Sequence, residues 1–340
     1  MSKQITIIGS GIAGMEAAAK FSEMGYSVIL IEKENKMGGH VSKWHNIFPD
    51  YTPAKEIISK LKSTLTKNIK VFYETEIENV VTLDGKYYLQ LSNSQNIESE
   101  VVLITTGFEL FNASKKEEYG FGIYENVITS ANLEEKFNSG RPIKTSRDAT
   151  PKRVAFIHCV GSRDEKAGNK YCSKVCCANA VKLAIETKQL LPDAEIYSFY
   201  MDLRMFDRYF EDLYFEAQSK YGIRFIRGRL SEACENPDGT IILKAEDTLS
   251  GKPLKMTVDM AVLMVGFTSS VKTIDLAAKF NIAVDNDKFI KPLDNHLNLN
   301  ITSQPGIFVA GACTGPKSIA ETLADARSAA IQVINYLQSN

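Results

Sequence analysis

The sequence predicts an α/β fold built from two nested dinucleotide-binding domains, and three observations support this. Apolar strand-like segments alternate with amphipathic helical segments along the 340 residues, as expected of parallel sheets covered by helices. The first strand leads directly into the turn Gly9-Ser10-Gly11-Ile12-Ala13-Gly14, which has the glycine spacing of a phosphate-binding turn. Two later apolar strands each end in a glycine, Gly107 and Gly266, which indicates two domains of this kind.

The first domain opens with a strand at Gln4–Ile8, a helix from the glycine turn to about Met24, and a strand at Val28–Ile31. It continues with a helix at Lys55–Thr66 and strands at Lys70–Val81, Lys86–Leu91 and Val101–Ile104, with an Asp84-Gly85 turn between the first two strands. The end of the chain adds a strand at Ile307–Ala310 and a helix at Ile319–Leu337. We therefore expect a discontinuous first domain of residues 1–111 and 287–340, the one in which the motifs discussed below favour FAD.

Residues 112–150 are expected to form a polar linker that carries a short helix at Ala131–Asn138. The second domain, residues 151–286, is expected to resemble a degenerate NAD(P)-binding domain. Its predicted strands are Val154–His158, Glu195–Tyr200, Arg224–Arg227, Leu230–Cys234, Ile241–Lys244 and Met260–Val265. Its predicted helices are Ala178–Leu190 and Phe206–Tyr221.

Composition excludes some classes of partner. The chain has 40 basic and 41 acidic residues, so nothing points to nucleic acid or to an anionic membrane surface. Its apolar residues are spread along the chain, and no run approaches the roughly 18 residues that predict a membrane span. Because the first predicted strand begins close to Met1, we expect no signal peptide. We expect a cytoplasmic protein, in which clustered cysteines are more often metal ligands or catalytic thiols than disulfides.

The first glycine turn has the full context of a dinucleotide site. Gly9 allows the tight turn, Gly11 lets the backbone approach a pyrophosphate, and Gly14 allows the helix to pack closely on the strand. The helix N-terminus would stabilise the phosphate charge. Glu32, at the end of the second strand, can accept hydrogen bonds from ribose hydroxyls.

Three further segments favour FAD over NAD in this domain. Gly38-Gly39 resembles the second glycine pair of flavoproteins with two dinucleotide-binding domains, and Thr105-Thr106-Gly107 resembles their strand end. The segment Gly306–Gly311 resembles the C-terminal strand that returns to the flavin. Most such proteins place an aspartate after that last glycine to bind the ribityl chain, whereas this chain has Ala312.

The turn that follows is also expected to lie near the flavin. Ser318 and Glu321 predict a capping box at the start of the last helix, whose positive end would favour an anionic reduced flavin. Lys317 is expected to place its ammonium near the flavin, with a solvated surface lysine as the alternative. The positions expected to contact FAD are Gly9, Gly11, Ile12, Ala13, Gly14, Glu32, Lys33, Gly39, His40, Ile77, Thr106, Gly107, Gly311, Ala312, Lys317 and Ser318.

Four of the six cysteines lie where a second phosphate-binding turn would be expected: Cys159, Cys172, Cys176 and Cys177, spaced C-x12-C-x3-C-C. Since no glycine turn follows the strand, conventional NAD(P)H binding is disfavoured there. Four cysteines commonly hold an iron–sulfur cluster, whereas zinc sites usually show paired C-x2-C knuckles. Spacing alone favours a cluster and leaves open a redox dithiol, zinc or inert cysteines. We expect Arg163, Lys170 and Lys174 to offset the negative charge of such a site.

Across nearly its whole length the chain resembles the A-subunit family of heterodisulfide reductases. The motifs that carry the resemblance are GSGIAGMEAA, GGHVSKWHNIFP, FIHCVGSRDE with YCSKVCC, FIRGR and FVAGACTGPKSIAET. The resemblance implies a fold similar to thioredoxin reductase and to pyridine-nucleotide-disulfide oxidoreductases. It also implies a [4Fe-4S] cluster close to FAD, with Cys159, Cys172, Cys176 and Cys177 as ligands, and a lysine by the flavin at Lys317.

The chain lacks the C-x2-C-x2-C-x3-C runs of the methanogen A subunits and is similar to the short A-like subunit of the heterodisulfide-reductase-like complex of sulfur oxidation. That resemblance implies an electron-transfer subunit that works with iron–sulfur subunits of the B and C types and forms a homodimer. The alternatives are the A subunit of a quinone-interacting oxidoreductase complex, a stand-alone NAD(P)H-dependent disulfide reductase, and a non-catalytic FAD-binding scaffold.

Overall fold

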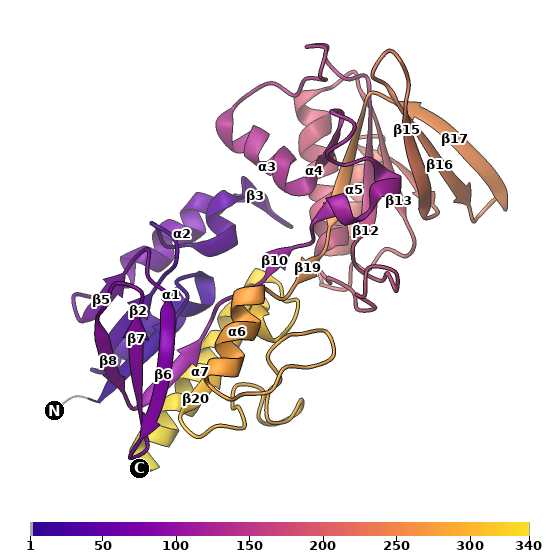
Figure 1. The fold of residues 1–340 in the computed structure, drawn as a ribbon. Coiled ribbons are helices and arrows are strands. Elements are labelled where there is room, and N and C mark those ends of the chain that lie inside the picture. Colours follow the sequence, from indigo (N-terminus) through magenta and orange to yellow (C-terminus); the bar gives the residue numbers. More distant parts are fainter. Residues whose placement is uncertain (1–2, 340) are drawn as a thin grey trace. The chain divides into compact units, whose positions relative to one another are not determined.

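The computed structural model describes residues 3–339, which form two compact units (Figure 1). Unit 1 takes its residues from the ranges 1–42, 54–109 and 268–340, and unit 2 comprises 43–53 and 110–267. Residues 268–286, expected in the second domain, therefore pack with unit 1, and the expected linker 112–150 belongs to unit 2. The assignment of FAD to one unit and a degenerate NAD(P)-like role to the other stays a prediction.

Unit 1 is built on a five-stranded parallel sheet with the order β20-β9-β1-β2-β5. The strands are β1 (Gln4–Ile8), β2 (Ser27–Ile31), β5 (Ile69–Phe72), β9 (Val101–Ile104) and β20 (Ile307–Val309). Alternate side chains of each strand point to opposite faces. Ile5 and Ile7 face α1 (Ile12–Glu23) and α7 (Ile319–Ser339), while Ile8 faces the opposite layer.

The opposite layer of unit 1 contains an antiparallel sheet and a helix. The sheet is formed by β6 (Ile77–Leu83), β7 (Lys86–Leu91) and β8 (Asn96–Ser99), and the helix is α6 (Val271–Lys279). Leu89 and Leu91 of β7 and Leu276 of α6 join the core beneath β1 and β9. The remaining helix of this unit is α2 (Ala54–Ser63).

Unit 2 repeats this plan with a parallel sheet in the order β11-β18-β12-β13-β14. The strands are β11 (Val127–Thr129), β12 (Arg153–Val160), β13 (Glu195–Tyr200), β14 (Arg224–Arg227) and β18 (Met260–Val265). The helices α3 (Ser130–Ser139), α4 (Cys176–Leu190) and α5 (Phe210–Ser219) pack in one core. The other core includes the antiparallel strands β15 (Leu230–Glu235), β16 (Ile241–Asp247) and β17 (Lys252–Val258).

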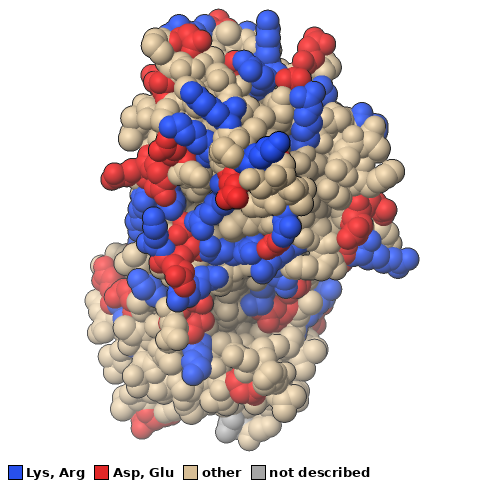
Figure 2. Space-filling view, turned by 90° about the vertical axis from the view of Figure 1, so that its right-hand side faces the viewer, with Lys and Arg blue, Asp and Glu red and all other residues tan. Residues whose placement is uncertain are grey.

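Two short strand pairs complete the topology. Strands β3 (Asn46–Ile47) and β4 (Thr52–Pro53) pair in the 43–53 segment, whose aromatic side chains Phe48 and Tyr51 pack on the helical core of unit 2. Strands β10 (Glu109–Leu110) and β19 (Phe267–Thr268) pair where the chain passes between the two units. Acidic and basic side chains are interspersed on the face shown in Figure 2, in keeping with the net charge of −1.

The predicted α/β class is confirmed, and the differences have local causes. The strand expected at Lys70–Val81 is divided into β5 and β6 by a turn in which Glu74 has a left-handed φ of 49°. The expected linker supplies β11, which completes the unit 2 sheet beside β18. The pattern also missed β8, β17 and α6, and it placed the start of α5 four residues too early.

Candidate cofactor sites

The glycine turn after β1 has the shape that a dinucleotide site requires. A Cβ at Gly9 would lie 2.5 Å from the Thr105 carbonyl oxygen, and one at Gly14 would lie 1.9 Å from the Gly9 carbonyl oxygen. A Cβ at Gly11 would meet no atom of the described chain within 4 Å. Gly9 and Gly14 are therefore needed for packing inside the protein, whereas Gly11 exposes its backbone to an approaching ligand. This arrangement fits a bound pyrophosphate.

Glu32 lies at the end of β2, buried beneath the turn. Its Oε2 accepts hydrogen bonds from the Ser10 backbone N–H at 2.8 Å and the Ser10 hydroxyl at 2.6 Å. Its Oε1 accepts one from the Glu34 backbone N–H at 2.9 Å. A carboxylate has about four lone-pair sites, so Glu32 organises the turn and retains capacity for a ribose hydroxyl.

Gly39 and His40 border the same turn. A Cβ at Gly39, where φ is 54°, would lie 3.2 Å from Gly11 Cα, so the second glycine pair packs directly on the first turn. His40 Nε2 bonds to the Phe108 carbonyl oxygen at 2.8 Å, and the two rings stack at 4.4 Å. The Gly38-Gly39-His40 segment therefore contacts the segment that follows β9, through His40 and Phe108.

The remaining predicted FAD contacts and their neighbour Thr105 differ in burial and in hydrogen bonding. Thr105 Oγ1 donates to the Gly9 carbonyl at 2.8 Å, and Thr106 Oγ1 bonds to Thr273 Oγ1 at 2.9 Å. Lys33 is exposed and Ile77 is buried in the core. All sixteen predicted positions lie in unit 1; their contacts with FAD stay predictions.

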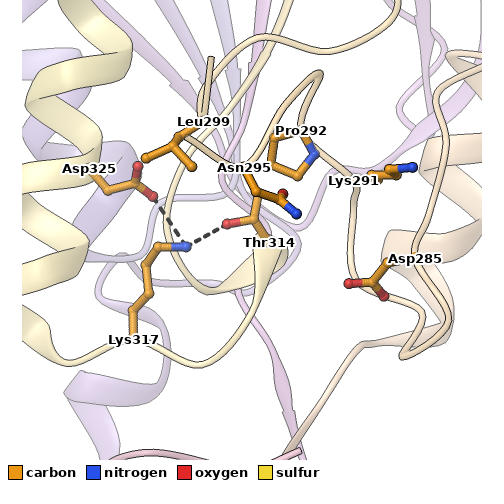
Figure 3. Close-up of a pocket in the computed structure, with 8 residues that line it drawn as sticks. All are labelled: Asp285, Lys291, Pro292, Asn295, Leu299, Thr314, Lys317 and Asp325. Carbon is orange, nitrogen blue, oxygen red and sulfur yellow. Dashed lines mark hydrogen bonds and ion pairs between the residues drawn. The ribbon is translucent and has the colours of Figure 1, made fainter. Parts of the chain in front are cut away.

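Lys317 lies inside the turn that follows β20 (Figure 3). Its Nζ donates to Thr314 Oγ1 at 2.5 Å and to the Gly311 carbonyl at 3.2 Å, and it lies 3.5 Å from Asp325 Oδ2. The alternative of a freely solvated lysine is therefore wrong. These side chains border a cavity of about 190 Å³ that Asp285, Lys291, Pro292, Asn295 and Leu299 also line.

Asp325 and Ser318 fix the two ends of this turn. Asp325 Oδ2 accepts from the Gly311 N–H at 2.8 Å, and its Oδ1 accepts from Asn300 Nδ2 at 2.7 Å. Asp325 thus brings a carboxylate next to Gly311 from α7, although Ala312 lacks one. Ser318 and Glu321 exchange the two hydrogen bonds of the predicted capping box, which is confirmed.

In unit 2, three of the four clustered cysteines are brought together by β12 and α4. Cys159 lies in β12, where the register with β18 shifts and its φ of 58° is left-handed. Cys176 and Cys177 are the first two residues of α4, and all three are buried. The thiol of Cys176 lies close to those of Cys159 and Cys177 and interacts with both. A left-handed φ is strained for cysteine, and such strain is found mainly at functional sites.

The contacts among these thiols separate their acidities. Hydrogen bonds with Cys159 and Cys177, together with burial, raise the pKa of Cys176 well above its ordinary value. The interaction with Cys176 lowers the pKa of Cys159 and of Cys177. His158 and the N–H of Arg204 lower the pKa of Cys177 further, and the N-terminus of a helix favours a thiolate in the same way. The trio is thus poised to carry negative charge.

Cys172 lies apart from these contacts, on the loop between β12 and α4. It is partly exposed, and its sulfur accepts a hydrogen bond from the Lys174 N–H at 3.3 Å. Among residues 3–339, no three His, Cys, Asp or Glu side chains are arranged as ligands of one metal ion. The four cysteines fit an iron–sulfur cluster in their chemistry, and the structure assembles three of them.

The charged residues of the loop have different roles. Lys170 pairs with Glu165 at 3.0 Å on the surface, so it is not directed at the thiols. Arg163 bonds to Asp202, and Asp164 is buried between Lys116 at 2.8 Å and Arg229 at 2.6 Å. Of the FIRGR motif, Arg227 pairs with Asp202 and Arg229 with Asp164. The motif therefore holds the cysteine loop in place.

A buried ion network that the sequence did not reveal anchors α4. Lys182 is fully buried and contacts Glu134 at 2.6 Å and Glu186 at 3.4 Å. Its Nζ also donates to the Asn46 carbonyl at 2.8 Å, and Glu134 accepts from the His45 N–H at 2.8 Å. The only signal for it in the sequence is the i, i+4 spacing of Lys182 and Glu186 on one helix face.

Most of the chain matches one known protein family. The family described as "Pyridine nucleotide-disulphide oxidoreductase" matches residues 3–153 and 180–330. The chain belongs to the pyridine nucleotide-disulphide oxidoreductase family. Between the two matched segments lie residues 154–179, which contain all four clustered cysteines. The cysteine loop thus lies in the segment that the family match does not cover.

The curated relatives of this oxidoreductase bear more specific names. It is 31% identical, over 98% of its length, to the A subunit of the "H(2)/formate:CoB-CoM heterodisulfide,ferredoxin reductase" of Methanococcus maripaludis, 64% of which is covered. It is 32% identical, over 97% of its length, to an iron–sulfur A subunit of the "CoB--CoM heterodisulfide reductase" of Methanopyrus kandleri, 63% of which is covered. The chain spans less than two thirds of the length of these relatives.

Solved structures confirm the fold. The thioredoxin reductase of T. acidophilum superposes with a TM-score of 0.68 over 99% of both chains, at 16% identity. The thioredoxin reductase of Lactococcus lactis superposes with a TM-score of 0.67 over 100% of both, at 18% identity. Within the part of the chain that the structure describes, no helix is both long and apolar enough to cross a membrane.

Proposed function

We propose that this chain is the flavin- and iron–sulfur-containing electron-transfer subunit of a heterodisulfide-reductase-like complex. The observation that carries the proposal is the pairing of two different turns on one fold. A glycine turn follows β1, and a cysteine loop follows the equivalent strand β12. Family membership implies FAD for the first, and relatives named as iron–sulfur A subunits support a cluster at the second.

FAD when bound supplies two-electron redox chemistry, and a [4Fe-4S] cluster supplies one-electron transfer. In this proposal Gly11 presents its backbone to the pyrophosphate and Glu32 accepts a ribose hydroxyl. Lys317, held by Thr314 and Asp325, places a positive charge in the turn after β20. A cation there would stabilise an anionic reduced flavin.

Cys159, Cys172, Cys176 and Cys177 are the proposed cluster ligands. Cys176 lies close to both Cys159 and Cys177, and Cys172 would supply the fourth thiolate from the loop between β12 and α4. Buried cysteine thiols in contact are well placed to bind metal once deprotonated.

Electron transfer between proteins requires docked partners, and we propose iron–sulfur subunits of the B and C types, together with a homodimer of this chain. An exposed aromatic group lies on the segment that borders Cys177: Phe206, Tyr209 and Phe215 expose 68%, 55% and 69% of their surface. The thiol of Cys177 faces the Asp202 carbonyl of the same segment at 3.8 Å. Exposed aromatic residues are enriched in protein interfaces.

The finer assignment that we propose is sulfur-compound oxidation in the cytoplasm, and the A subunit of a quinone-interacting complex is its nearest alternative. The two predict different electron acceptors. Co-purification of the tagged chain with B- and C-type subunits and a lipoate-binding protein would support sulfur oxidation. Recovery with a membrane-bound quinone-reactive subunit would contradict it.

A stand-alone disulfide reductase is the second candidate, because the hydrogen-bonded thiols of Cys159, Cys176 and Cys177 also suit a redox dithiol. Anaerobic purification followed by analysis of FAD, iron, sulfide and zinc separates the two. We expect FAD and iron together, with sulfide equal to iron. FAD without iron after reconstitution, with NAD(P)H bleaching the flavin and two thiols lost on oxidation, would establish the dithiol enzyme instead.

A further inference from the structure

Two buried polar atoms in the turn after β12 have no hydrogen-bond partner among residues 3–339: the Ser162 hydroxyl oxygen and Arg163 Nη1. Ser162 is fully buried. More than nine in ten buried polar groups in proteins are paired with protein or ordered water, and an unmade buried hydrogen bond costs about 1–3 kcal/mol. The described residues therefore supply no acceptor for these two adjacent donors, which leaves them available to a group bound at this turn.

The guanidinium of Arg163 is held in a fixed position. Its Nη2 donates to Asp202 Oδ2 at 2.7 Å, and Asp202 Oδ1 accepts from Arg227 at 3.2 Å. The backbone N–H of Arg163 donates to the Tyr171 carbonyl at 2.8 Å, and the φ of Arg163 is 53°. Because a left-handed φ is unfavourable for arginine, the loop maintains this placement at a cost.

The guanidinium is linked to the cysteine site through Asp202. Burial opposes the charge of Arg163, but the bond to Asp202 and the negative charge that Cys159 and Cys172 carry when deprotonated raise the pKa of its guanidinium. These two cysteines stand on opposite sides of Arg163 in the sequence. The carbonyl of Asp202 meanwhile faces the Cys177 thiol at 3.8 Å. Asp202 therefore contacts the cysteine site through its carbonyl and holds Arg163 through its carboxylate.

We propose that Arg163 donates a hydrogen bond from Nη1 to a sulfur atom of the group that the four cysteines bind, and that Asp202 is the positioning residue that aims it. This proposal rests on the proposed function, since it requires a cluster on these cysteines. Hydrogen bonds and positive charge at cluster sulfurs raise the reduction potential, because they stabilise the more negative reduced state.

The test is a redox titration, followed by EPR, of the full chain purified anaerobically, after its iron, sulfide and FAD have been quantified. Arg163→Gln should keep the iron content of the wild type and shift the cluster potential to lower values. Arg163→Lys, which keeps the charge but not the planar donor geometry, should restore part of that shift. The matched control is Lys170→Gln, which removes the same charge from an exposed position of the same loop and should leave the potential unchanged.

Asp202→Asn tests the positioning role through the sign of its effect. Loss of a negative charge alone would raise the cluster potential, whereas release of Arg163 from its position should lower it. A rise would overturn the role of Asp202.

If Arg163→Gln and Lys170→Gln give the same potential as the wild type, the donor role of Arg163 is wrong even though the cluster exists. If Arg163→Gln does not retain its iron, the same comparison is made with Arg163→Lys, whose unchanged potential would equally overturn the proposal. Absence of iron from the wild type would instead refute the proposed function itself.

Discussion

The turns that follow β1 and β12 occupy equivalent places in two sheets of the same order, yet they are built for different ligands. After β1, three residues, Gly9 to Gly11, lead into α1; after β12, residues 161–175 intervene before α4. The first turn uses glycine for close backbone packing. The second places the non-glycine residues Arg163 and Lys174 at left-handed positions, after Cys159 near the end of β12, which has a left-handed φ as well. One topology thus offers backbone amides in one unit and thiols in the other.

The helices after these turns are also anchored differently. Helix α1 packs closely through Gly14, and its Glu16 pairs with Arg327 of α7 at 2.6 Å. Helix α4 is anchored by the buried Lys182 with Glu134 and Glu186. The two ion pairs differ in burial, because Arg327 is largely exposed whereas Lys182 is fully buried. Substitutions in the two units can test this contrast.

The largest expected effect is that of Cys176→Ala, because Cys176 contacts both Cys159 and Cys177. We expect loss of nearly all bound iron with full retention of FAD, measured by metal analysis and flavin absorbance. Cys234→Ala, a change at a cysteine of β15 outside the cluster, is the control and should keep its iron. A Cys176→Ala protein that still carries a full complement of iron would remove this residue from the ligand set.

Lys182→Met should destabilise unit 2, because it leaves the carboxylates of Glu134 and Glu186 buried without their cation. Removing one partner of a buried ion pair costs about 3–5 kcal/mol, to be measured as the loss in the free energy of unfolding by urea. Lys188→Met changes a lysine farther along α4 that bonds only to backbone carbonyls, and should cost about 1 kcal/mol. Equal losses in the two variants would show that the buried network is no anchor.

Gly14→Ala and Gly11→Ala should separate folding from binding in unit 1. The first inserts a Cβ against the Gly9 carbonyl and should cost about 1–3 kcal/mol of stability. The second meets no protein atom, so the apoprotein should lose about 1 kcal/mol or less while FAD binds more weakly. Apoprotein unfolding and FAD titration measure the two effects. Unchanged FAD affinity in Gly11→Ala would place the pyrophosphate elsewhere.

The smallest expected effect is a change in how the stability of the protein depends on pH when Asp164 is replaced. Burial opposes its charge, but bonds to Lys116 and the charge of Arg229 hold the pKa of Asp164 below its ordinary value. A carboxyl with a lowered folded-state pKa contributes stability above the unfolded value, about 3.9, and loses it as pH falls through the folded pKa. Urea unfolding between about pH 5 and pH 3 should therefore depend less on pH in Asp164→Asn than in the wild type. Asp193→Asn, a surface change, should follow the wild type; identical slopes for all three would contradict the assignment.

Much of the fold could be predicted because apolar strands and glycine turns are local signals. Strands β1, β9, β13, β14 and β18 were predicted with the bounds that the structure gives them. Strand β17 (Lys252–Val258) was missed because charged residues alternate with its apolar ones and a Pro lies near its start. The role of residues 127–129 as a sheet strand depends on pairing with β18, which lies far away in the sequence.

The sequence could predict which residues belong to the candidate sites, but not the ion pairs that hold those residues in place. Spacing alone grouped Cys159 with Cys176 and Cys177, which the structure brings into contact. It gave no hint that Asp325 would hold Lys317 or that Asp202 would hold Arg163. Those pairs join residues from separate elements, and only the folded chain brings their charges together.

The measurement that tests the central claim most directly is an EPR spectrum of the anaerobically purified full chain after reduction, with spins counted against bound FAD. The account predicts about one [4Fe-4S] signal per FAD, and its loss in Cys176→Ala. A fully flavinated chain that gives no cluster signal, even after reconstitution with iron and sulfide, would contradict it. In that case the cysteines after β12 would serve as thiols and not as cluster ligands.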